Sequence, residues 1–181
     1  MEHTIESVGT SGPARARRVE PPHSADERTM LTAWLDWHRS TVREKCAGLD
    51  SGSARRAPLP TSPLMSIEGI VSHLRWVEHA WFESVLLGLP DQGPYTSEDP
   101  DAEWRLGARV PLPDLLDAYD AQCARSREIT AKLELGSTSR GRASDGTRTL
   151  RWVLVHMIEE TARHNGHLDL LRECADGATG R

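Results

Sequence analysis

Four residues that can bind metal ions recur at helical spacing near the end of the sequence. They are His156, Glu160, His164 and His167, within VLVHMIEETARHNGHLDLLRE. At about 100° per residue, the angle of an α-helix, they share one face with apolar residues such as Met157. A carboxylate buried on such a face is costly unless another group compensates its charge, and buried imidazoles need partners too. A divalent cation would compensate both.

Glu160 and His164 form the clearest pair in this stretch. Residues four apart lie on adjacent turns of one helical face and can reach a common ion. Two ligands from one helix do not complete a metal site, so a third ligand must come from another segment. The candidates that the sequence offers elsewhere are His73, Glu78 and His79 in SHLRWVEHAWF, and His38.

The same pattern also fits a site without a metal. Most pairs of glutamate and histidine at this spacing bind nothing, and the histidines could hydrogen-bond one another and Glu160 as a structural network. Spacing alone therefore leaves a metal site and a polar network as alternatives. The tryptophans at positions 34, 76, 81 and 152 are expected in the core and the helix seams rather than around a cofactor.

Four segments with helical periodicity must position these side chains. Apolar residues recur at three- and four-residue steps in each segment, and the stretches between them are rich in proline, glycine and serine. Ser66 is a suitable N-cap for the second segment, which Gly88 ends. The pattern predicts an all-α four-helix bundle, with a short helical turn at DPDAEWRL and a loop at SGSARRAPLPTSPL. The four helices are expected at about 25–50, 67–88, 113–135 and 150–174.

The length of 181 residues suits one domain with a sizeable core. Residues 1–24 are polar and lack periodicity, so we expect a disordered N-terminal tail there. The helical bundle is expected over residues 25–176, followed by a frayed C-terminal tail over 177–181.

Composition argues against several classes of protein. The net charge is −5 and no basic stripe is present, so nucleic-acid binding is not indicated. No apolar run approaches the roughly 18–20 residues of a membrane span, and the first residues lack the apolar core of a secretory signal. The three cysteines have no CxxC spacing, which favours buried thiols in a reducing cytoplasm over disulfides or a cysteine-built zinc site. Among 22 basic residues only Lys45 and Lys132 are lysines, which suggests a high-GC bacterium.

Two motifs together resemble a known superfamily. GIVSHLRWVEHAWFESVL, followed much later by TLRWVLVHMIEETARHNGHLDLLRE, resembles the DinB-like (YfiT-like) superfamily of metal-binding four-helix bundles. The likeness covers about residues 25–178 and is closer to the actinobacterial mini-circle protein subgroup. The glutamate at position 160, where many relatives have histidine, also resembles the more distant mycothiol-dependent maleylpyruvate isomerase branch.

The resemblance implies a divalent metal ion held by His73, Glu160 and His164. Zinc or nickel is expected, and iron also suits two histidines and one carboxylate. His167 departs from the commonest family pattern, and it is expected to support a ligand, to serve as an alternative ligand or to act as an acid or base. His156 and His38 are expected in supporting roles near the ligands.

The resemblance also implies a class of reaction. Characterised relatives include S-transferases and isomerases that use low-molecular-weight thiols such as mycothiol. Three protein ligands leave an open position on the ion, where a thiol would lose its proton and then attack an electrophile. The alternative is a non-enzymatic metal-binding or stress-related protein, and in either case a homodimer is compatible with the family.

Overall fold

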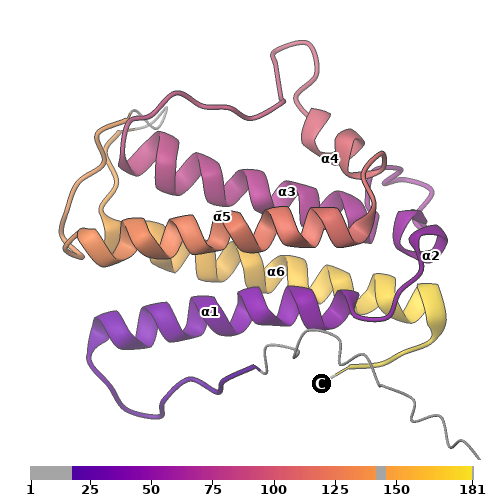
Figure 1. The fold of residues 1–181 in the computed structure, drawn as a ribbon, viewed down its shortest axis with the longest axis horizontal. Helices are drawn as coiled ribbons and strands as arrows, with labels where there is room; N and C mark the ends of the chain where they lie inside the picture. The colour runs from indigo at the N-terminus through magenta and orange to yellow at the C-terminus, as the bar shows by residue number, and fades with distance from the viewer. Residues whose placement is uncertain (1–17, 142–145, 181) are drawn as a thin grey trace, which may run out of the picture.

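The computed structural model describes residues 18–141 and 146–180. Four long helices form a bundle, and two short helices lie at one end of it (Figure 1), which confirms the expected all-α class. The described residues form no β-strand, and their β-structure is limited to isolated bridges such as the antiparallel one between Thr138 and Thr149. The elements in chain order are α1 (Glu27–Cys46), α2 (Ser51–Arg55), α3 (Ile67–His79), the π-helix η1 (Ala80–Leu86), α4 (Ala102–Gly107), α5 (Leu112–Lys132) and α6 (Leu150–Asp176).

The long helices do not simply alternate in direction. α1 and α6 run in parallel, since Arg151 pairs with Glu27 near their starts and the Asn165 amide donates to the His38 carbonyl farther along. α3 and α5 run the opposite way (Figure 1). The connection from α3 to α5 must therefore return to the end of the bundle where α3 began. α4 lies on this crossover and packs against α3.

Local capping explains where several elements begin and end. The Ser66 hydroxyl accepts a hydrogen bond from the Gly69 amide at the start of α3, as expected of an N-cap. Gly88 follows η1 with a φ of 73°, a left-handed conformation that glycine adopts without strain. The expectation of an unbroken loop after α1 is wrong, because the Asp50 side chain accepts from two amide groups and starts α2 there.

The core consists of two hydrophobic clusters along the bundle axis. One includes Val42 of α1 and Tyr119 of α5, and the other includes Leu35 of α1 and Phe82 of η1. Two of the tryptophans expected in the core or seams, Trp34 and Trp152, are instead 42% exposed. Within the described residues, no helix combines the length and the apolar character that crossing a membrane requires.

A buried ion pair lies between the two clusters and connects α1 to α3. The Arg39 guanidinium donates to both carboxylate oxygens of Glu78 at 2.7 Å, and both side chains are almost completely buried. Two parallel charge-assisted hydrogen bonds satisfy the carboxylate on both oxygens. Both oxygens of Glu78 are therefore engaged by Arg39, and the residue has a structural role in this pair.

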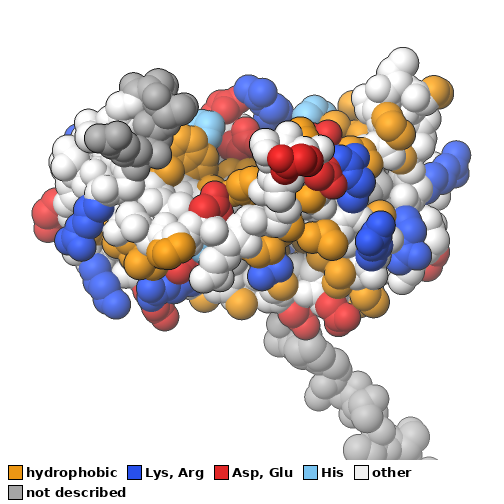
Figure 2. All heavy atoms as spheres, turned by 90° about the horizontal axis from the view of Figure 1, so that it is seen from above, with side chains coloured by type: hydrophobic (Ala, Val, Ile, Leu, Met, Phe, Trp, Pro, Cys, Tyr) orange, Lys and Arg blue, Asp and Glu red, His pale blue; other side chains and the backbone are white. Residues whose placement is uncertain are grey.

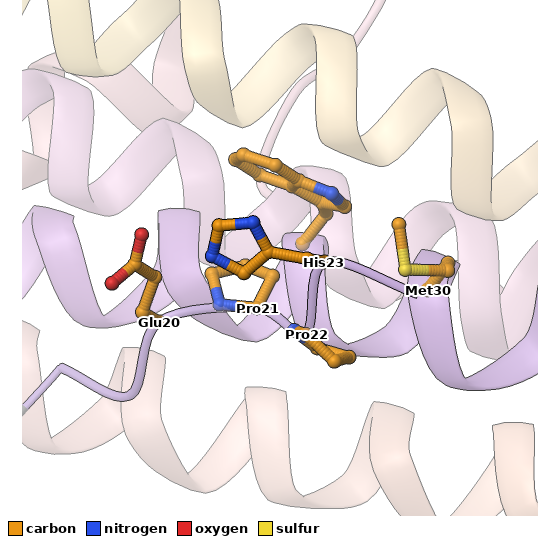
Figure 3. A pocket seen from close by; sticks show the side chains of 6 residues that line it. Glu20, Pro21, Pro22, His23 and Met30 are labelled. Carbon is orange, nitrogen blue, oxygen red and sulfur yellow. The ribbon is translucent and has the colours of Figure 1, made fainter. Parts of the chain in front are cut away.

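The described part of the N-terminal segment lies along α1. The Arg18 guanidinium stacks over the Trp37 ring at 4.6 Å, and His23 lines a small pocket with Met30 (Figure 3). Most of the expected disordered tail lies outside the described residues, so that expectation stays a prediction. At the other end, Gly177 terminates α6 with a φ of 76°.

Candidate metal centre

Three of the residues singled out in the sequence come together between α3 and α6. Glu160 and His164 lie one turn apart on α6, and His73 lies on α3, 87 positions before Glu160. The Glu160 Oε1 atom is 3.2 Å from His73 Nε2 and 3.3 Å from His164 Nε2. Each residue offers one ligand-type atom, and all three atoms lie within 4.8 Å of one another.

This geometry fits a small divalent cation. Ligand atoms about 2.0–2.1 Å from a tetrahedral zinc ion lie about 3.3–3.4 Å from one another, which is close to the two distances at Glu160. The side chains of His73 and Glu160 are each 17% exposed, so the group is open to solvent on one side. On the face that α3 and α4 form, histidine side chains are visible among hydrophobic and acidic ones (Figure 2).

The site also includes a carboxylate that the sequence analysis missed. Glu103 on α4 is buried, and its Oε1 atom lies 3.4 Å from His73 Nδ1. His73 therefore has a carboxylate at each ring nitrogen, Glu103 at Nδ1 and Glu160 at Nε2. A neutral imidazole carries one N–H and can donate to only one of them. A cation between Nε2 and Glu160 would satisfy the second contact.

The neighbour of this carboxylate, Trp104, forms one wall of the group. Its ring stacks on the His73 ring with the centroids 4.4 Å apart and the planes 19° apart, and it lies 5.8 Å from the His164 ring. The sequence analysis predicted a short helical turn at DPDAEWRL, the stretch that contains Glu103 and Trp104. Nothing in that pattern indicated that the turn packs beside His73, since the contact spans 30 positions of the chain.

The imidazoles shift the ionisation of the carboxylate that they share. The pKa of the Glu160 carboxyl lies well below its usual range, because the His164 imidazole and then the His73 imidazole hydrogen-bond to it. Burial opposes this effect without cancelling it. Glu160 is therefore a carboxylate at neutral pH, which is the form that binds a cation.

His167 contacts the group through His164. The two Nδ1 atoms are 3.4 Å apart and the rings meet edge to face. Burial, followed by the charges of His164 and Arg163, lowers the pKa of His167 below its ordinary value, so its imidazole is neutral at pH 7. A neutral ring at this position can accept a hydrogen bond from the Nδ1–H group of His164.

The structure does not bring His156 and His38 to the group. The described ring contacts of His156 are with Trp152, on which it stacks at 5.1 Å, and with Trp81 at 4.6 Å. His38 lies on α1, where its nearest described polar partner is the amide of Asn165.

The remaining candidates for a third ligand have other partners. Glu78 is held by Arg39, as described above. His79 contacts the Glu83 carboxylate through Nδ1, and its Nε2 atom accepts a hydrogen bond from the backbone N–H of Gln92. His73 is therefore the histidine of α3 that faces Glu160.

Comparison with known proteins agrees with these motifs. A search of proteins with curated functions found no match. The family model described as mycothiol-S-transferase matches residues 30–177, which include all of α1 except its first three residues, the other three long helices and every residue of the group. The chain belongs to the mycothiol S-transferase family, within the DinB-like superfamily that its two motifs resemble.

Proposed function

We propose that this protein is a metal-dependent S-transferase that joins the sulfur of mycothiol to an electrophilic small molecule. His73, Glu160 and His164 would hold one divalent cation, for which zinc and nickel suit the ligand set best. The observation that carries the proposal is the convergence of two imidazole nitrogens on one carboxylate oxygen, at 3.2 and 3.3 Å. The family match supports mycothiol as the thiol.

The proposed reaction breaks the S–H bond of the thiol. The proton passes to solvent, the sulfur electron pair forms a bond to the electrophilic atom, and the leaving group departs with the electrons of its former bond. A bound divalent cation would supply the positive charge that stabilises the thiolate. The partial exposure of His73 and Glu160 leaves the group accessible to a small molecule.

The contact between His167 and His164 supports an orienting role for His167. If His164 binds a cation through Nε2, its proton is on Nδ1, and this N–H donates a hydrogen bond to Nδ1 of His167. The proton of His167 is then on Nε2, which leaves that ring without a free basic nitrogen. Of the roles expected from the sequence, support of a ligand fits this arrangement better than proton abstraction.

Metal analysis combined with a transfer assay tests the proposal. After incubation with zinc or nickel and removal of free ion, we expect about one equivalent of metal per chain in the wild type and far less in His164→Ala and Glu160→Ala. His156→Ala is the matched control, since it removes a histidine of the same helix that does not contact the group.

The transfer assay uses mycothiol with a model electrophile such as monobromobimane. We expect conjugation above the uncatalysed rate in the loaded wild type and not in His164→Ala. Equal metal content in the wild type and both alanine variants would refute the site. Metal binding without accelerated transfer would instead favour the non-enzymatic alternative.

A further inference from the structure

The short helix α4 packs unusually closely against α3. A Cβ atom placed on Gly107 would lie 2.6 Å from the Glu68 carbonyl oxygen and 3.0 Å from the Gly69 Cα atom. The Ser72 hydroxyl, on the next turn of α3, donates to the Glu103 carbonyl at 2.6 Å. These contacts fix the position of α4 along α3. One of them is made by Ser72, the residue just before His73.

This docking places the Glu103 carboxylate against His73 on the side of the ring away from Glu160. Oε1 of Glu103 is 3.4 Å from Nδ1, whereas Nε2 faces Glu160. The Trp104 ring covers one face of the imidazole. Both the position of the nitrogens and the plane of the ring are thus set by two consecutive residues of α4.

Stability alone does not explain why a carboxylate occupies this position. Glu103 is 7% exposed, and its Oε2 atom is buried with no hydrogen-bond partner among the described residues. The one described hydrogen-bond partner of the carboxylate is the His73 ring. A buried carboxylate with so few partners is costly for folding. An uncharged side chain of the same shape would fold at least as well.

We propose that Glu103 is a positioning residue for His73, an inference that rests on the proposed metal site. With a cation between Nε2 and Glu160, the single proton of the neutral His73 ring lies on Nδ1, and the Glu103 carboxylate accepts its hydrogen bond. The Nε2 lone pair is then directed toward Glu160 and available to a cation. A carboxylate behind a ligating histidine also raises the basicity of the imidazole.

The test measures zinc affinity by competition with a chelator. We expect Glu103→Gln to bind zinc about 10–100-fold more weakly than the wild type, with the melting temperature of the metal-free protein unchanged or higher. The matched control is Glu68→Gln, which neutralises a buried carboxylate on α3 whose described partner is Arg55. Its zinc affinity is expected to equal that of the wild type.

Nitrogen NMR of the wild-type protein provides a second measurement that needs no variant. In the zinc-loaded protein, where a cation occupies the Nε2 side of the ring, we expect the His73 proton on Nδ1. A zinc-loaded wild type whose His73 ring keeps its proton on Nε2 would overturn the assignment, even if Glu103→Gln failed to fold.

The outcomes separate the two proposals. If His73→Ala loses zinc binding while Glu103→Gln keeps the wild-type affinity, the role of Glu103 is wrong and the metal site stands. If His73→Ala binds zinc as tightly as the wild type, the metal site itself is wrong. A metal-free Glu103→Gln protein that melts lower, with unchanged zinc affinity, would indicate a purely structural carboxylate.

Discussion

Two glutamates on neighbouring helices show how partners decide what a buried carboxylate does. Glu78 receives two hydrogen bonds from Arg39, and this fully compensated pair connects α1 to α3. Glu160 has no arginine or lysine partner among the described contacts, and two imidazoles face one of its oxygens instead. The first arrangement leaves no capacity for a ligand, whereas the second retains it.

The three thiols differ in the same way, by their surroundings. Cys46 and Cys123 are buried and Cys174 is exposed. Burial raises the pKa of Cys46 to about 12, and burial likewise raises the pKa of Cys123. Because the thiolate is the reactive form, we expect one thiol of the native chain to react rapidly with Ellman's reagent at pH 8, and three in denaturant. Cys174→Ala should abolish the rapid phase.

The same burial predicts how stability depends on pH. Above about 8.5, the ordinary pKa of a thiol, the unfolded chain loses the Cys46 proton while the folded chain keeps it up to about 12. The folded state then binds more protons, so the free energy of unfolding falls as the pH rises through this window. Urea unfolding at pH 8 and pH 10 should show the loss, and Cys46→Ala should show less of it. An equal loss in that variant would contradict this account.

At the scale of elements, the proposed site depends on α4, a short helix that is not one of the four long helices of the bundle. It contributes six residues, yet it supplies both the carboxylate and the indole that contact His73. Its position follows from the crossover between α3 and α5, which passes back along α3. The same crossover explains why a short helix far from either ligand-bearing motif meets the group.

A single methyl group at the α3–α4 contact should therefore affect metal binding. Gly107→Ala places its Cβ atom against backbone atoms of Glu68 and Gly69, which cannot rotate away, so α4 must shift. We expect a loss of stability of about 1–3 kcal/mol and weaker zinc binding, measured by urea unfolding and chelator competition. Gly136→Ala, which meets no atom within 4 Å, is the control. Unchanged zinc affinity in Gly107→Ala would show that the position of α4 does not affect metal binding.

At the scale of the molecule, the proposed ligands connect the two halves of the chain. His73 and Glu160 are 87 positions apart and belong to antiparallel helices of the bundle. An unfolded chain does not hold these atoms together. Any ion that they bind must therefore favour the folded state over the unfolded one.

Metal binding should accordingly raise the melting temperature. At a free zinc concentration of 100 times the dissociation constant, the native state gains about 2.7 kcal/mol. For a chain of this length that corresponds to a shift on the order of 5–10 °C, which differential scanning fluorimetry resolves. His164→Ala should show no shift. A wild-type curve that zinc leaves unchanged would favour a purely structural polar network.

Local rules were sufficient for much of this protein. The period of the apolar residues predicted the four long helices, and capping chemistry predicted the start of α3 at Ser66, because both depend on residues within one or two turns. The same local geometry places Glu160 and His164 on one face of α6. The π-helical end of α3 and the helix α2 were not predicted, since weak local signals compete there with packing.

The tertiary structure decided which polar residues meet. On the helical wheel, His156 and His164 lie equally close to Glu160, yet His164 faces His73 whereas His156 stacks on Trp152. Glu103 had no distinguishing pattern in the sequence. Its role depends on the close contact of α4 with α3. Sequence by itself thus determined the helices and their faces, because helical periodicity is local. Only the packing of α3, α4 and α6 determined the partners of His73, because those contacts join positions 30 and 87 residues apart.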